Sequence, residues 1–150
     1  MNIRHELFLD AISYWIDECT DDLPLLQRFT KNFILDGLKI ILEWNYFYFV
    51  GKFCRQIKGT AMGTIFAVVG SNLVIAFLEI KLFRMLPQIY PHDFIDIFTR
   101  NYFRFLDDVF HKCLSEFDIE PLEKLLNSLD PDIKFLMDHI SEHNNFLMLI

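Results

Sequence analysis

The stretch Tyr102-Phe103-Arg104-Phe105-Leu106-Asp107-Asp108-Val109-Phe110 decides the fold that we predict for this chain. Two apolar, β-prone runs lie on either side of an adjacent carboxylate pair, which predicts a β-hairpin with Asp107 and Asp108 at its tip. Neighbouring carboxylates repel each other, and a divalent cation relieves that repulsion; hard oxygen ligands suit Mg²⁺ or Mn²⁺. A polar turn between two strands explains the same pair without a metal. The rest of the chain has to decide between these two interpretations.

Length and composition indicate one modest domain with an unusually aromatic core. The chain has 150 residues, of which 53% are hydrophobic and 17 are phenylalanine. Such a chain either buries these rings or presents a surface that a partner covers. The formal net charge of −7 argues against a nucleic-acid binder coated in basic residues, although it allows a local basic groove.

The cysteines and the apolar segments indicate an intracellular protein, nuclear or cytoplasmic, with no membrane partner. Cys19, Cys54 and Cys113 are widely spaced and odd in number, which predicts buried, reduced thiols rather than disulfides or a zinc site. Acidic residues follow closely on the first apolar ones, so the start does not resemble a signal peptide. Residues 65–78 form the longest apolar stretch, which is shorter than the roughly 20 residues of a membrane span and predicts a buried core helix.

The order of predicted elements is typical of an α+β fold. Apolar spacing predicts helices over residues 5–19, 30–43, 65–86 and 119–129, and a short helix or loop over 93–99. Residues 45–57 predict a hairpin that turns near Gly51, and residues 134–137 and 146–150 predict two closing strands. We therefore expect helices on one face of an antiparallel sheet. A metal-binding carboxylate pair at a hairpin of such a sheet, beside a glycine turn that opens a helix, is the arrangement of a polymerase palm.

Two short segments before the long helix are candidates for ligand contact. Lys52, Arg55 and Lys58 form the densest basic patch and lie among aromatic residues, although basic residues on a hairpin are often only a solvated edge. Gly59 and Gly63 flank a turn of small residues that leads into the helix, where a backbone or a phosphate can approach closely. The spacing is not that of a P-loop.

Motif residues from these segments carry a resemblance to a known family. The first set is Gln56, Gly59, Ala61, Met62, Gly63, Ala67, Asn72, Leu73 and Glu79, and the second is Arg104, Phe105, Leu106, Asp107 and Asp108. In this order and spacing they resemble the reverse transcriptases, most closely the group of the Penelope-like retroelements. The segment over residues 126–135 also resembles the part of that family that follows, so the likeness extends over essentially the whole chain.

The chain departs from the family pattern at several positions. Val68 stands where the family usually has proline, Ser71 where it has alanine, and Phe105 where it has tyrosine. Leu147-Met148 stands where Leu-Asp is expected. Residues 2–6 resemble the stretch just after the family's first metal-binding aspartate, so that aspartate is expected upstream of Met1. Fingers and thumb are likewise expected outside residues 1–150, which would make the chain a partial reverse transcriptase domain.

The resemblance implies template-directed nucleotidyl transfer with an RNA template, a DNA primer and a dNTP. The upstream aspartate and Asp107 would hold two Mg²⁺ or Mn²⁺ ions, with Asp108 assisting. The implied nucleotide contacts are Gly59, Ala61, Met62 and Gly63. The implied nucleic-acid contacts are Lys52, Arg55, Gln56 and Lys58, of which Arg55 and Lys58 would reach backbone phosphate.

A non-enzymatic interpretation remains open beside the catalytic one. With only two of the family's three carboxylates, the chain by itself is expected to be inactive and to bind the metal weakly. The rival is a non-enzymatic remnant of a retroelement, or an interaction module whose aromatic residues serve a partner.

Overall fold

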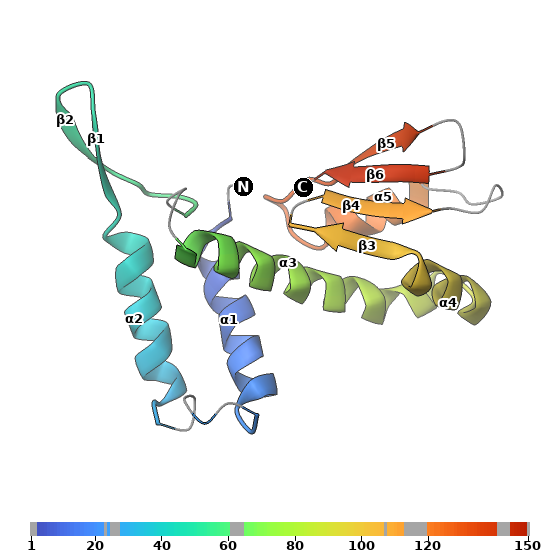
Figure 1. Cartoon of the computed structure of the whole chain (residues 1–150), viewed down its shortest axis with the longest axis horizontal. Helices are drawn as coiled ribbons and strands as arrows, with labels where there is room; N and C mark the ends of the chain where they lie inside the picture. The colour runs from blue at the N-terminus through green and yellow to red at the C-terminus, as the bar shows by residue number, and fades with distance from the viewer. Residues whose placement is uncertain are drawn as a thin grey trace. The chain divides into compact units, whose positions relative to one another are not determined.

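The structure is a computed structural model that describes residues 3–22, 24, 28–60, 65–106, 108–112, 120–140 and 145–149 (Figure 1). Side chains at 65, 111, 112, 137–140 and 145–149 are outside the description. The helices are α1 (His5–Cys19), α2 (Lys31–Glu43), α3 (Ile65–Met85), the 3₁₀ helix η1 (Leu86–Gln88), α4 (His92–Arg100) and α5 (Glu120–Ser128). The strands are β1 (Tyr46–Phe49), β2 (Lys52–Arg55), β3 (Tyr102–Phe105), β4 (Asp108–Lys112), β5 (Leu136–Ile140) and β6 (Asn145–Leu149).

These elements confirm the predicted α+β class and most of the predicted order. The segment expected to be a short helix or a loop is the helix α4, and the penultimate strand begins at Leu136 rather than at residue 134. The strands form two separate antiparallel sheets instead of the single sheet that we expected. One is the hairpin β1-β2, and the other has the strand order β3-β4-β6-β5. Among the described strands, β1 and β2 pair only with each other, whereas β4 pairs with the distant strand β6 and so joins the second hairpin to the closing strands.

The chain divides into two compact units, residues 1–77 and 78–150, with the boundary inside α3. In the first unit, α1 packs on the first part of α3. The ring centroids of Phe8 and Phe66 lie 5.2 Å apart, and a Cβ added at Gly70 would lie 2.0 Å from Cζ of Phe8. Glycine at residue 70 therefore lets the Phe8 ring approach the backbone of α3. Trp15 Nε1 donates a hydrogen bond of 2.9 Å to the carbonyl of Leu73, which joins the same two helices.

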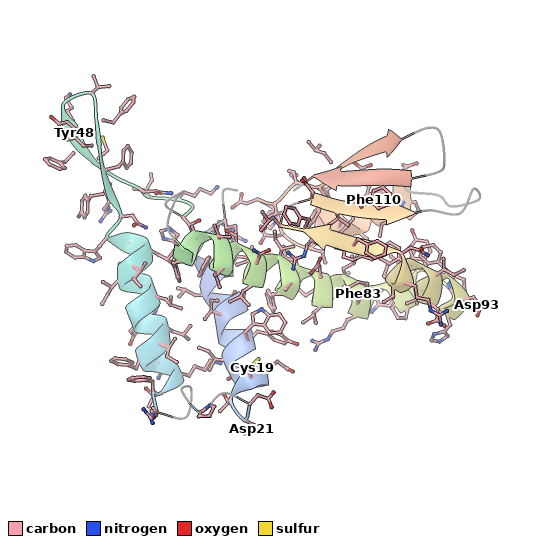
Figure 2. All side chains as sticks on the ribbon, in the orientation of Figure 1. Cys19, Asp21, Tyr48, Phe83, Asp93 and Phe110 are labelled. Carbon is pink, nitrogen blue, oxygen red and sulfur yellow. The ribbon has the colours of Figure 1, made fainter. Side chains whose placement is uncertain are left out.

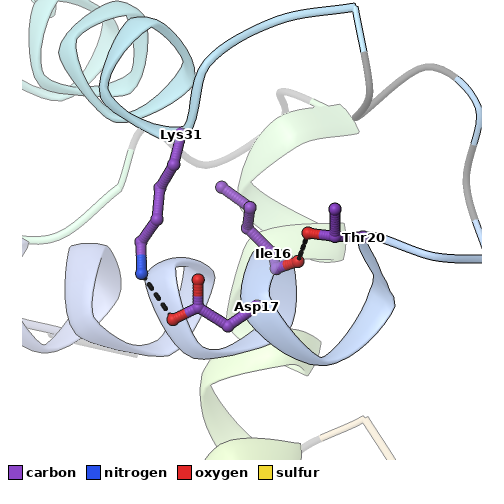
Figure 3. A network of polar contacts seen from close by, with 4 residues as sticks. All are labelled: Ile16, Asp17, Thr20 and Lys31. Atoms are coloured by element: carbon purple, nitrogen blue, oxygen red, sulfur yellow. Dashed lines mark hydrogen bonds and ion pairs between the residues drawn. The ribbon is translucent and has the colours of Figure 1, made fainter.

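Polar contacts fasten α1 to the start of α2 (Figure 3). The Lys31 Nζ atom lies 2.5 Å from Asp17 Oδ2, and the Thr20 hydroxyl donates to the carbonyl of Ile16 at the end of α1. Thr30 is the N-cap of α2, and its side chain accepts a hydrogen bond of 3.2 Å from the amide of Phe33. Threonine suits this position because its hydroxyl satisfies an amide that has no partner within the helix.

The hairpin β1-β2 follows α2 and is exposed over nearly its whole length. Tyr46 pairs with Arg55 and Phe49 with Lys52, which leaves Val50 and Gly51 as a two-residue turn. Both turn residues have positive φ, 48° for Val50 and 76° for Gly51, as in a type I′ turn. Side chains extend from both sides of this ribbon, Tyr48 among them (Figure 2).

The second unit has its own apolar core below the four-stranded sheet. Its buried members are Leu78, Leu82, Leu86, Phe98, Val109, Leu122, Leu125, Leu126, Ile133 and Phe135. The side chain of Asn127, near the end of α5, pairs with both backbone groups of Phe135, as a neighbouring strand would. Its Oδ1 accepts from the Phe135 amide at 3.0 Å, and its Nδ2 donates to the Phe135 carbonyl at 3.1 Å. These two bonds fix the connection that leads into β5.

The helix α3 has a length and composition that a membrane span would also have. Residues Phe66–Gln88 meet those criteria, and 39% of the most apolar window is buried within the protein. A core helix of a soluble protein passes the same test, so this is weak support for a span. Val74, Ile75, Leu78 and Leu82 are buried, which favours the core helix that the sequence predicts.

Candidate functional site

The predicted hairpin over residues 102–110 is present as β3 and β4. Phe105 pairs with Asp108, which leaves Leu106 and Asp107 as the two residues between the strands. Leu106 has a φ of 57°, a left-handed conformation that costs a non-glycine residue roughly 1–2 kcal/mol. Asp107 lies outside the described residues. Asp108 is the first residue of β4 and is the member of the carboxylate pair that the structure locates.

The two faces of this hairpin have opposite environments. Arg104 and Val109 are paired across the strands and point inward, and the side chain of Val109 is 0% exposed. Phe105 and Asp108 are paired on the other face, where Phe105 is 75% exposed. Leu136 of β5 lies on the same row of the sheet, two strands from Asp108, and is also exposed. Asp108 therefore lies on an open, largely apolar face of the sheet.

A polar cluster on the inward face joins β3 to α3. The Tyr102 hydroxyl donates to Glu79 Oε1 at 2.7 Å, and Arg104 Nε lies 2.8 Å from the same oxygen. The side chains of Arg104 and Glu79 are only 20% and 16% exposed. Burial raises the pKa of Tyr102 well above its ordinary value, and the Glu79 carboxylate adds to that shift. Tyr102 therefore remains a hydrogen-bond donor at neutral pH.

The same arginine also holds the turn that carries the carboxylate pair. Arg104 Nη1 donates to the carbonyl of Leu106 at 3.0 Å. Because Leu106 is the residue in the left-handed conformation, this bond braces the strained point of the turn. Glu79 and Arg104 both belong to motifs singled out in the sequence, but their pairing was not predicted. The sequence feature that could have predicted this pair is a lone acidic residue on an apolar helix, Glu79, and a lone basic residue on an aromatic strand, Arg104.

The metal prediction rests on a pair of which one member is described. Among the described residues, no group of three or more histidine, cysteine, aspartate or glutamate side chains lies close enough to hold a metal ion. The Asp108 carboxylate is on an exposed face, which a hydrated Mg²⁺ ion can reach. Asp108 could therefore supply one carboxylate ligand to a metal ion, and Asp107 would have to supply the second.

The predicted nucleotide-binding turn is described at one of its four positions. Ala61, Met62 and Gly63 lie outside the described residues. Gly59 is buried and has a φ of 77°, a conformation that glycine adopts without strain. Its carbonyl lies 3.1 Å from His5 Nε2, which donates to it when that nitrogen carries the proton. This contact ties the start of the turn to the first residue of α1.

The four predicted nucleic-acid residues lie at different places around β2. The strand register puts Arg55 on the same face as Tyr46, and Lys52 on the opposite face with Phe49. Gln56 Nε2 donates to the carbonyl of Lys58 at 2.9 Å, so this amide helps to shape the segment after β2. An open pocket of about 250 Å³ is lined by His5, Glu43, Arg55, Gln56 and Ile57. Arg55 and Gln56 are the two predicted residues that meet there.

Comparison of the chain with protein-family models, curated proteins and solved structures finds no match. The resemblance to reverse transcriptases therefore stays a prediction that rests on the motif residues themselves.

Proposed function

We propose that this chain is a palm segment of an RNA-directed DNA polymerase of the Penelope-like type. The observation that carries this proposal is the β3-β4 hairpin. Asp108 lies on its open face, directly after a strained turn that the Arg104–Glu79 pair braces from behind. A carboxylate that follows a braced turn and lies on an accessible sheet face suits a two-metal nucleotidyl transfer site.

The roles of the residues follow from this proposal. A bound pair of Mg²⁺ ions would activate the primer 3′-hydroxyl and stabilise the departing pyrophosphate. Asp107 and Asp108 would hold the metal, and the turn from Gly59 to Gly63 would lie beside the incoming nucleotide. Arg55 would contact the phosphate backbone of an RNA template or a DNA primer. Glu79 and Arg104 would keep the acidic turn in one conformation, which limits the reorganisation needed when a metal binds.

Residues 1–150 are expected to be inactive without further segments. The family uses three carboxylates, and this chain offers two at the hairpin. Mg²⁺ gives up its hydration water reluctantly, so two adjacent carboxylates alone should bind it weakly. A second, correctly placed ion would then be missing and the displacement would not be clamped.

A non-enzymatic interaction module is the second candidate, and a specific observation favours it. Large apolar side chains are exposed on both faces of β1-β2, and Phe103, Phe105 and Phe110 are exposed on β3-β4. Contiguous exposed apolar surface marks an interaction site. The polymerase proposal accounts for it through the segments and the nucleic acid that would cover it, and the rival accounts for it through a protein partner.

Primer extension separates the two candidates. On an RNA template with a DNA primer and Mg²⁺ or Mn²⁺, residues 1–150 should extend nothing. A polypeptide that adds an upstream aspartate segment, fingers and thumb should extend the primer, and Asp107→Ala or Asp108→Ala should abolish this activity. Asp93→Ala, an exposed position in α4, is the matched control and should leave it unchanged.

Two results would overturn parts of this proposal. Extension by residues 1–150 that disappears in Asp107→Ala would show that two carboxylates suffice. An extended polypeptide whose activity is indifferent to both substitutions would remove the hairpin from the catalytic site.

A further inference from the structure

We propose that one face of the β1-β2 hairpin binds single-stranded nucleic acid by stacking bases on its aromatic rings. The face consists of Tyr46, Tyr48, Phe53 and Arg55 and is called the stacking face below. The inference deepens the proposed function, from which it takes nucleic acid as the occupant. Its test is nevertheless independent of polymerase activity, because binding needs neither a metal nor the carboxylate pair.

The strand register defines the stacking face. Tyr46 pairs with Arg55 and Tyr48 pairs with Phe53, and alternate residues of a strand share one face. The two rows are about 7 Å apart along the hairpin. The rings of Tyr48 and Phe53 meet edge to face, with centroids 5.1 Å apart. Trp44 extends the series, because its ring lies 6.3 Å from that of Tyr46.

These rings contact one another and are nevertheless accessible. Tyr48, which Figure 2 shows on the hairpin, is 66% exposed, and Phe53 of β2 is 84% exposed. Their mutual contacts hold the rings in place, so little conformational freedom is lost when a base stacks on them. Every nucleobase has a flat apolar face, so such a platform accepts a strand without regard to its sequence.

The local charge is opposite to that of the whole chain. Residues 44–58 contain Lys52, Arg55 and Lys58 and no acidic residue, whereas the chain carries a net charge of −7. Glu43, at the end of α2, is the acidic residue that lines a pocket together with Arg55. An anionic occupant is therefore favoured at this hairpin and disfavoured over most of the remaining sequence. Arg55 lies in the same row as Tyr46, so a phosphate beside Arg55 would leave the adjoining base next to a ring.

Chemistry also separates a nucleic acid from the two other possible occupants. A second copy of the chain or an anionic membrane would be held by apolar area, which leucine supplies as well as a ring does. Base stacking needs the flat π-surface, which leucine lacks. Substitution of a ring by leucine therefore distinguishes the three occupants.

The experiment measures fluorescence anisotropy of a labelled oligo-dT of about ten nucleotides titrated with the 150-residue chain at low salt. Tyr48→Leu and Phe53→Leu should each weaken binding roughly tenfold, and Tyr48→Phe should keep it. Phe49→Leu, on the opposite face of the hairpin, is the matched control and should change nothing. Arg55→Gln should make the negative slope of log K against log salt shallower by about 0.7, whereas Lys124→Gln in α5 should leave it unchanged.

Two outcomes would overturn the inference. One is equal loss of binding in Phe49→Leu and Phe53→Leu, and the other is the absence of oligonucleotide binding. In the second case, binding to vesicles of phosphatidylserine and phosphatidylcholine, or self-association in sedimentation, that survives Tyr48→Leu would identify a membrane or a second copy of the chain as the occupant. Oligonucleotide binding should persist in Asp108→Ala. If it does, and the extended polypeptide is inactive in primer extension, the stacking face is supported and the polymerase proposal is rejected.

Discussion

The hairpins β1-β2 and β3-β4 are alike in local structure and different in environment. Each begins with a four-residue strand rich in aromatics and turns through two residues, and in each the first turn residue is a non-glycine with positive φ, Val50 and Leu106. In β1-β2 aromatic side chains are exposed on both faces. In β3-β4 the face that carries Tyr102 and Arg104 contacts Glu79 of α3.

This comparison shows that an aromatic strand pattern predicts a hairpin but not which of its faces is buried. The inward face of β3-β4 is closed because α3 supplies both a carboxylate and an aromatic ring to it. The ring centroids of Phe83 and Tyr102 lie 5.5 Å apart. Within the described residues, no comparable pair of contacts covers either face of β1-β2. The first hairpin therefore keeps aromatic side chains exposed on both faces, and the second has one face closed against α3.

The largest expected effect comes from removing the carboxylate that closes β3-β4. Glu79→Ala leaves a mostly buried arginine and a tyrosine hydroxyl without their shared acceptor. We expect a loss of about 3 kcal/mol in the free energy of unfolding, measured by urea denaturation. Glu120→Ala breaks an exposed ion pair with Lys124 and should leave the midpoint unchanged. Equal losses in both variants would mean that the cluster does not hold the hairpin.

Truncation at equivalent positions of the two hairpins should give unequal losses. Val109 and Phe53 occupy the same place in their strands, but Val109 is 0% exposed and Phe53 is 84% exposed. Val109→Ala should cost about 2 kcal/mol, because it removes buried methyl groups and leaves a cavity. Phe53→Ala should cost less than about 0.5 kcal/mol. Similar midpoints in thermal denaturation of the two variants would erase the contrast between the hairpins.

Alkaline pH should destabilise the chain through Tyr102. The folded-state pKa of Tyr102 is raised above the unfolded value of about 10, so its stabilising contribution is complete below that pH and is lost as pH rises. Above about pH 10 the free energy of unfolding should fall by up to about 1.4 kcal/mol for each further pH unit. Urea denaturation between about pH 9 and 11 should show this extra slope in the wild type and not in Tyr102→Phe. Tyr48→Phe, on the exposed hairpin, should retain it.

The smallest expected effect concerns the turns, where the hairpins should behave alike. Asparagine tolerates the left-handed conformation better than valine or leucine does. Val50→Asn and Leu106→Asn should therefore each raise the free energy of unfolding by up to about 1 kcal/mol. The Arg104 contact to residue 106 uses the backbone carbonyl and survives the change. A gain at residue 50 together with a loss at residue 106 would show that the Leu106 side chain contributes packing as well.

The sequence was sufficient to predict the local elements of this protein. Apolar spacing gave the bounds of α1, and the change to β-prone aromatic runs gave both hairpins, including the turn near Gly51. Asp108, which was predicted at the tip of the second hairpin, is instead the first residue of β4. The helices and hairpins depend on neighbours a few residues apart, whose periodicity and turn chemistry are visible in the sequence. Glu79 and Arg104 were marked as motif residues by the resemblance to reverse transcriptases, not by these local patterns.

Only the tertiary structure decided how those elements are used. The pairing of β4 with β6, the separation into two sheets, and the convergence of Tyr102 and Arg104 on Glu79 all join residues far apart in sequence. Two similar aromatic hairpins offer the same local pattern to the rest of the chain. Whether a face of a hairpin is buried depends on which helix packs against it. That packing and its hydrogen bonds join residues far apart in the sequence, which no local pattern specifies.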